Sequence, residues 1–244
     1  MAGSDIFLHD SVSRDFVGKR FKNIIKLTAD IFGRYKNLIY VVPCGVAVRA
    51  VSPLIHNKYT DPAVVVVDAG GRYAVSLLSG HEGGANDLAV AVGNIIGGEP
   101  VITTTTEALK RYIIGIGCRK GVAEAAIVRA VREAIRQAAV DLSEVRLLAS
   151  ADIKSGEKGL LAAACALGLP IRFIPSEEIR ESKRTFTRSA LAEKEVRLPA
   201  VAEPAALLAG RRTRLVLPKT KFNGITVAVA KESFTWWESD REDR

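Results

Sequence analysis

The chain has 244 residues, of which 48% are hydrophobic and 25% are charged, and this balance excludes a wholly disordered protein. The length suits one large folded domain or two small ones. No apolar run approaches the roughly 20 residues needed to cross a bilayer, and the first residues lack the layout of a signal peptide. We therefore expect no membrane association and a cytoplasmic location.

The formal net charge of +8 favours anionic partners. Its basic residues are dispersed and do not alternate with aromatic residues, so we do not expect nucleic acid to be the partner. Three cysteines and three histidines are scattered without the spacing of metal ligands. We expect reduced thiols and no protein-bound metal or cofactor.

Hydrophobic periodicity predicts alternating helices and strands in the first half of the chain. Two β-branched runs, LIYVVP and AVVVVD, are typical of strands buried on both faces. Helices are expected at 17–32 and from residue 88 to 96, and strands at 38–43, 63–68, 73–78 and 101–103. The polar run TTTTE at 103–107 then predicts a connection between two lobes.

The second half repeats this alternation, which indicates the α/β class. Strands are expected at 112–117, 145–149, 171–174, 215–218 and 225–231, and helices at 122–139, 159–167 and 202–208. We predict two small three-layer lobes with mainly parallel sheets and glycine-rich strand-to-helix loops. Their predicted bounds are 1–108 and 109–233, followed by a charged tail at 234–244.

The loop SGHEGGAND follows the strand at 73–78 and concentrates small and polar residues where an α/β sheet binds ligands. His81 suits proton transfer near neutral pH, and Glu82 is a second candidate base. The plainer alternative is that His81 only shapes the loop through backbone hydrogen bonds. Asn86 could cap the following helix. The loop residues expected to contact a ligand are Ser79, Gly80, Gly83, Gly84 and Asn86.

A second glycine-rich segment, GIGCRKG, is expected to place basic side chains at a helix N-terminus, where they would bind a carboxylate. Cys118 is either a nucleophile or a small structural residue of a tight loop. The spacing is not the GxGxxG nucleotide fingerprint. The candidate ligand contacts here are Gly117, Cys118, Arg119, Lys120 and Gly121.

A third segment, PCGVAVRAVSP, contains Gly45 and Arg49, which could form an anion-binding turn between a strand and a helix. The alternative is that both residues serve packing and solvation.

Several long motifs, in the same order, resemble the CbiG family of cobalamin biosynthesis. They are PCGVAVRAVSPLI, TDPAVVVVDAGGRYAVSLLSGHEGGANDLA, PVITTTTE, GIGCRKG, AEPAALLA and PKTKFNGITVAVAK, and together they span most of the chain. The resemblance implies a cobalt-precorrin-5A hydrolase, which opens the ring A δ-lactone and releases C20 as acetaldehyde. It also implies an anionic corrinoid substrate that carries its own cobalt and binds between the two lobes.

Two departures from the family affect these expectations. The chain starts later than typical members and lacks their middle region between TTTTE and GIGCRKG, so we expect the first sheet to be incomplete or closed by a partner, such as the second copy in a homodimer. Val122 stands where the family often has a Ser or Thr helix cap.

The carboxy-terminal part also resembles CobE, so a corrinoid-binding or escort protein without chemistry is the alternative function. A basic α/β module that binds nucleotide or nucleic acid ranks third.

Overall fold

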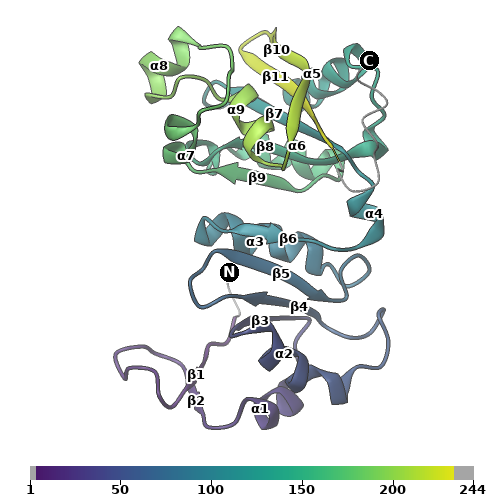
Figure 1. Ribbon diagram of the computed structural model, residues 1–244, viewed down its shortest axis with the longest axis vertical. Coiled ribbons are helices and arrows are strands. Elements are labelled where there is room, and N and C mark those ends of the chain that lie inside the picture. Colours follow the sequence, from purple (N-terminus) through teal and green to yellow (C-terminus); the bar gives the residue numbers. More distant parts are fainter. Residues whose placement is uncertain (1–3, 234–244) are drawn as a thin grey trace. The chain divides into compact units, whose positions relative to one another are not determined.

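The computed structural model describes residues 4–233 as a mixed α/β protein with helices between strands (Figure 1). The chain divides into two compact units. One unit contains the chain up to Val92 and Gly98–Ile102, and the other contains Gly93–Gly97 and the chain from Thr103 onward. The predicted tail at 234–244 lies outside the described residues, and the predicted lobe bounds stay predictions.

The first unit is built on a four-stranded sheet in the order β3-β4-β5-β6. Its elements are β3 (Asn37–Val41), β4 (Ala63–Val67), β5 (Tyr73–Leu78), β6 (Glu99–Val101), α1 (Ile24–Ile31), α2 (Cys44–Val51), η1 (Ser52–Leu54) and α3 (Ala85–Ile96), of which the part from Gly93 onward belongs to the other unit. A separate parallel pair, β1 (Phe7–His9) and β2 (Lys19–Phe21), precedes them. Strands β3 and β4 run parallel, as do β5 and β6, whereas β4 and β5 are antiparallel.

Alternate side chains of β4 point to opposite faces of this sheet, and both faces are covered. Val64 and Val66 pack with α1 and α2, and Val65 packs with α3. All five residues of β4 are buried, which explains its uninterrupted apolar sequence. The first unit therefore has the three layers that were expected.

The helix expected at 17–32 is only partly correct, because residues 19–21 form strand β2 and α1 begins at Ile24. The side chain of Asn23 sets this start. Its Oδ1 accepts hydrogen bonds from the N–H groups of Ile25 (3.0 Å) and Lys26 (3.1 Å), which have no partner inside the helix.

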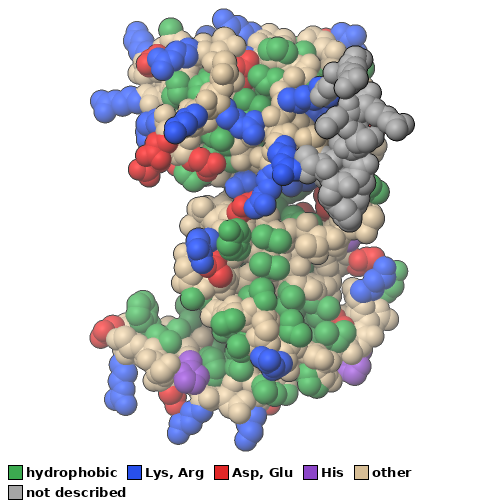
Figure 2. Space-filling model, viewed as in Figure 1, with side chains coloured by type: hydrophobic (Ala, Val, Ile, Leu, Met, Phe, Trp, Pro, Cys, Tyr) green, Lys and Arg blue, Asp and Glu red, His purple; other side chains and the backbone are tan. Residues whose placement is uncertain are grey.

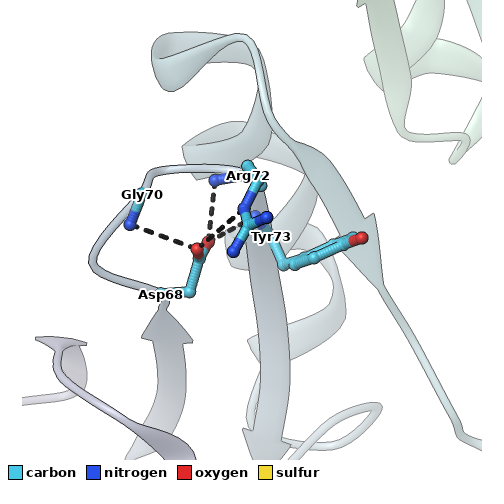
Figure 3. A network of polar contacts seen from close by, with 4 residues as sticks. All are labelled: Asp68, Gly70, Arg72 and Tyr73. Carbon is cyan, nitrogen blue, oxygen red and sulfur yellow. Dashed lines mark hydrogen bonds and ion pairs between the residues drawn. The ribbon is translucent and has the colours of Figure 1, made fainter.

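A carboxylate-centred turn joins β4 to β5 and reverses the chain (Figure 3). Asp68 Oδ1 accepts from the N–H groups of Arg72 (2.7 Å) and Tyr73 (2.8 Å), and its Oδ2 accepts from the N–H of Gly70 (3.1 Å). These bonds, led by the one from the Tyr73 backbone, lower the pKa of Asp68. The ionised side chain thus holds the turn that makes β5 antiparallel to β4.

The second unit contains a five-stranded sheet in the order β10-β11-β7-β8-β9. Its strands are β7 (Tyr112–Cys118), β8 (Val145–Ala151), β9 (Ile171–Ile174), β10 (Thr213–Phe222) and β11 (Ile225–Glu232). Its helices are α4 (Thr105–Ala108), α5 (Glu124–Gln137), η2 (Leu142–Glu144), η3 (Asp152–Lys154), α6 (Lys158–Leu167), α7 (Ser176–Glu181), α8 (Ala190–Val196) and α9 (Ala202–Leu208). Strands β7, β8 and β9 run parallel, and β11 pairs with β7 antiparallel.

Helices cover both faces of this second sheet as well. Helices α5 and α6 share one hydrophobic core with the strands, and α7 and α9 share the other. Helix α9 approaches β7 so closely that a Cβ on Gly115 would lie 1.9 Å from the carbonyl oxygen of Ala202. The α/β class with mainly parallel sheets is confirmed.

We predict that Asp68→Asn lowers the melting temperature at neutral pH, because an amide offers one acceptor oxygen in place of two. The pKa of Asp68 is lowered in the folded state, so its contribution to stability is present above the ordinary pKa of about 3.9. This contribution is lost as the pH falls through the lowered folded pKa. The gap in melting temperature between wild type and variant should therefore narrow below about pH 4.

Thermal unfolding followed by circular dichroism from pH 3 to 8 measures this gap. Asp30→Asn is the control, since Asp30 is exposed and lies away from the turn. A gap that is constant across the pH range would contradict the role given to the ionised side chain.

Candidate active site

The loop SGHEGG leaves the end of β5 and therefore lies beside the beginning of β4. In the register of the two strands Leu78 pairs with Val64, near the start of β4. The turn from β3 into α2 lies at the opposite edge of the sheet, where the N–H of Val42 donates to the carbonyl of Val67 at the end of β4. The sheet thus separates these two segments.

Gly45 lies in the first turn of α2, at that opposite edge. Arg49 is exposed on the same helix, and its Nη1 lies 3.5 Å from the carbonyl oxygen of Gly45. Gly45 therefore does not lie at the edge that carries His81, because β5 runs antiparallel to β4. Ligand binding by these two residues stays a prediction.

Backbone bonds close the SGHEGG loop on itself. The carbonyl of Ser79 accepts from the N–H groups of Gly83 (3.1 Å) and Ala85 (3.2 Å), and the carbonyl of Gly80 accepts from Asn86 N–H (2.9 Å). A Cβ on Gly83 would lie 2.4 Å from the Cβ of Ser79, so only glycine fits there. Gly84 has a φ of +84°, which also favours glycine.

Asn86 does not stand before the helix as a cap. Helix α3 begins at Ala85, so Asn86 lies within the first turn, and its Oδ1 accepts from Ser76 Oγ (2.8 Å). Its side chain is buried, with 6% of the residue exposed. This bond fastens the start of α3 to β5.

A second loop, residues 55–61, packs against the first. The buried carboxylate of Asp61 organises it by accepting from the N–H groups of His56 and Asn57, both at 2.9 Å. Ser79 Oγ donates to the carbonyl oxygen of Asp61 (3.1 Å). The two loops are thus joined at the beginning of β4.

His81 and Glu82 are both exposed on the SGHEGG loop. Glu82 Oε1 forms an ion pair with Lys58 Nζ at 2.5 Å. The hydrogen bond from Lys58 is the main cause that lowers the pKa of Glu82. A carboxylate with a lowered pKa is a weaker base, which favours the predicted role of His81 over that of Glu82.

The sequence did not indicate Lys58 as a residue of this site. It stands 24 residues before Glu82 in an ordinary polar stretch, and only the folding of the two loops brings them together. No local spacing in the sequence signals this pair.

The second glycine-rich segment lies at the carboxyl end of β7. Cys118 ends that strand, and the N–H of Arg119 donates to the carbonyl of Gly224 (3.1 Å) in the turn between β10 and β11. Arg119, Lys120 and Gly121 are exposed. A Cβ on Gly117 would lie 2.6 Å from Thr226 Oγ1 on the neighbouring strand β11, so this glycine has a packing role.

Arg119 and Lys120 do not stand at a helix N-terminus as expected. Helix α5 begins at Glu124, and its N-cap Ala123 has no side-chain capping bond, so the missing Ser or Thr cap is not replaced. The first turn of α6 packs against Val122, which precedes α5, since a Cβ on Gly159 would lie 1.9 Å from the carbonyl oxygen of Val122. The two basic residues lie in the loop between β7 and α5.

Burial raises the pKa of the Cys118 thiol. A thiol that stays protonated is a poor nucleophile. The structural alternative for Cys118 is therefore favoured over the nucleophilic one.

Two charged residues beside this loop were also missed. Lys154 ends η3, directly after β8, and Glu157 precedes α6. Lys154 Nζ lies 3.5 Å from Glu157 Oε1, and Glu157 Oε2 accepts from the N–H of Gly121 (3.1 Å). The available signal was the stretch KSGEKG, which places charges immediately after a buried strand.

Within residues 4–233 the structure has no group of three or more His, Cys, Asp or Glu side chains placed to hold a metal ion. Among the same residues, no helix combines the length and apolar character that a membrane span requires.

The fold and these loops define an α/β protein with glycine-rich loops at strand ends, one of which presents an imidazole beside an ion-paired carboxylate. Two family models match the chain: Cobalamin synthesis G N-terminal at residues 26–107 and Cobalamin synthesis G C-terminus at residues 112–230. The chain belongs to this cobalamin synthesis G (CbiG) family, whose curated relatives are named cobalt-precorrin-5A hydrolases.

The cobalt-precorrin-5A hydrolase of Salmonella typhimurium is 24% identical over 290 residues, covering 81% of this chain and 82% of that protein. That span exceeds the 244 residues of this chain, so the Salmonella protein contains internal segments without a counterpart here. Protein CobE of Sinorhizobium is 30% identical over 128 residues, covering 52% of this chain and 83% of CobE. A crystal structure of a cobalamin biosynthesis protein G homolog from Sulfolobus solfataricus, 21% identical, covers 89% of this chain and 88% of its own, with a TM-score of 0.41.

We predict that Lys58→Met raises the pKa of Glu82, because the hydrogen bond that lowers it is removed. Carbon-detected NMR titration of the Glu82 carboxyl measures this change. Lys26→Met, which removes an exposed charge from α1, is the control and should leave the titration of Glu82 unchanged. An identical titration curve in wild type and Lys58→Met would show that the ion pair does not form in solution.

Proposed function

We propose that this chain hydrolyses the ring A δ-lactone of cobalt-precorrin-5A and releases C20 with its methyl group as acetaldehyde, giving cobalt-precorrin-5B. The observation that carries the proposal is the exposed imidazole of His81, presented by a glycine-locked loop beside the Lys58–Glu82 ion pair. The names of the curated relatives support the coarser part of the proposal, a hydrolase that acts on cobalt-precorrin-5A.

In the first step, His81 takes a proton from water as the water oxygen attacks the lactone carbonyl. The Gly83 N–H is not assigned to the resulting oxyanion, because it already donates to the carbonyl of Ser79. The N–H of Gly84 is the donor in this proposal. The carbonyl–oxygen bond then breaks and leaves a carboxylic acid, the C20 alkoxide and protonated His81, which later returns its proton to the macrocycle.

In the second step, the C20 alkoxide becomes the carbonyl of acetaldehyde as the bond from C20 to the macrocycle breaks. The conjugated macrocycle takes the electron pair and then a proton, so the substrate itself serves as the electron sink. No protein-bound cofactor is needed in this scheme, and cobalt enters and leaves with the substrate.

The charge of the chain supports an anionic substrate with several carboxylate arms. The net charge is +8, and Figure 2 shows Lys and Arg side chains spread over both units on the face drawn. In the proposal Arg119 and Lys120 of the second unit bind peripheral carboxylates, since both are exposed at the end of β7.

A corrinoid-binding or escort protein without chemistry is the second candidate. The similarity to CobE favours it, but that similarity covers 52% of this chain. The SGHEGG loop lies in the part of the chain matched by the N-terminal family model, before the carboxy-terminal match at 112–230. An escort protein without chemistry would not use the exposed imidazole of this loop.

The test is to incubate the purified full chain with cobalt-precorrin-5A without oxygen and to measure released acetaldehyde. We expect acetaldehyde from the wild type and a loss of roughly 10²- to 10⁴-fold in kcat for His81→Ala, the usual contribution of a general base. His56→Ala is the matched control, because His56 is another exposed histidine of the first unit whose recorded contact is through its backbone N–H.

Corrinoid binding without acetaldehyde would overturn the hydrolase and support the escort protein. Unchanged turnover in a folded His81→Ala variant would overturn the role of His81 while leaving the reaction in place.

A further inference from the structure

Lys154 is a cation whose side chain is mostly covered by protein and whose ion pair is long. Its side chain is 12% exposed, and an ammonium group has three N–H donors. Among the described residues its ion-pair partner is Glu157, at 3.5 Å from Nζ. This exceeds the roughly 2.7–3.2 Å of a good N–H···O bond, whereas Lys58 and Lys110 reach their partners at 2.5 and 2.8 Å.

The carboxylate of Glu157 is held in place by a second bond. Its Oε2 accepts from the N–H of Gly121, so the side chain bridges the loop after β7 and the start of α6. Glu157 thus keeps one oxygen for the loop while the other stays at a long distance from Lys154. The ammonium retains donor capacity that a second anion can use.

The position of Lys154 is one where α/β sheets bind ligands. Strands β7, β8 and β9 run parallel, so their carboxyl ends lie at one edge, and Lys154 follows the end of β8 within three residues. The acidic neighbour Asp152 is already engaged, because its Oδ1 accepts from Ser176 Oγ and from the N–H of Ile153. Arg119 and Lys120 add exposed positive charge after the neighbouring strand β7.

We propose that Lys154 binds a carboxylate arm of the corrinoid substrate and makes the second unit selective for carboxylate over amide side chains. This inference rests on the proposed function for the identity of the ligand. The incoming carboxylate supplies the short charge-assisted bond that Glu157 does not, at a side chain that protein mostly covers.

The test measures binding of two corrinoids to the full chain, cobyrinic acid with free carboxylate arms and cobinamide with amidated arms. We expect Lys154→Met to weaken the binding of cobyrinic acid roughly 10- to 100-fold, the effect of losing a charged hydrogen bond, and to leave the binding of cobinamide unchanged. Lys158→Met, which removes an exposed charge four residues away, should change neither. Lys154→Arg should restore part of the selectivity.

Glu157→Gln gives a test of opposite sign. Glutamine keeps an oxygen for Gly121 N–H but removes the negative charge that competes for Lys154, so cobyrinic acid should bind more tightly. A purely structural ion pair predicts lower melting temperatures for both variants with unchanged selectivity, and that result would overturn the inference.

The two proposals fail separately. Acetaldehyde release by the wild type, with equal cobyrinic acid binding in wild type and Lys154→Met, would overturn the role of Lys154 alone. Selective binding of cobyrinic acid that depends on Lys154, without acetaldehyde release, would overturn the hydrolase and leave the carboxylate site.

Discussion

The turn held by Asp68 determines where the chemistry of the first unit can lie. Because its carboxylate binds three backbone N–H groups, β5 folds back against β4 and ends beside the start of β4. Only at that edge can the SGHEGG loop meet the loop at 55–61, through Ser79 with Asp61 and Lys58 with Glu82. A parallel β5 would carry His81 to the opposite edge.

The sequence allowed the elements and the α/β class to be predicted, but it did not allow strand direction to be predicted. The strand at 73–78 was placed correctly, between the turn residues before it and the glycine-rich loop after it. An apolar run has the same pattern in a parallel and in an antiparallel pair, so the sequence could not show that Gly45 and His81 lie at opposite edges of the sheet. The prediction that the first helix starts at residue 17 was wrong, because it rested on apolar spacing alone. The side chain of Asn23 caps the helix and sets its start at Ile24.

Glycines of the candidate site were visible in the sequence, whereas its charge pairs were not. Gly83 and Gly84 stand out in the sequence because small residues are concentrated in this loop. A Cβ at Gly83 would clash with Ser79, and Gly84 has a positive φ. Lys58 and Glu82 meet across 24 residues, and Glu157 meets Gly121 across 36. Such pairs depend on tertiary structure, and they set both the basicity of Glu82 and the environment of Lys154.

The closure of the SGHEGG loop by its own backbone bonds has a consequence for binding thermodynamics. Ordering a flexible loop costs about 1–2 kcal/mol of conformational entropy per residue, and a ligand that must order it binds correspondingly more weakly. Here that cost is already met during folding, through the bonds from Gly83, Ala85 and Asn86. A ligand that binds as proposed would therefore not have to order this loop, because its backbone bonds already hold it.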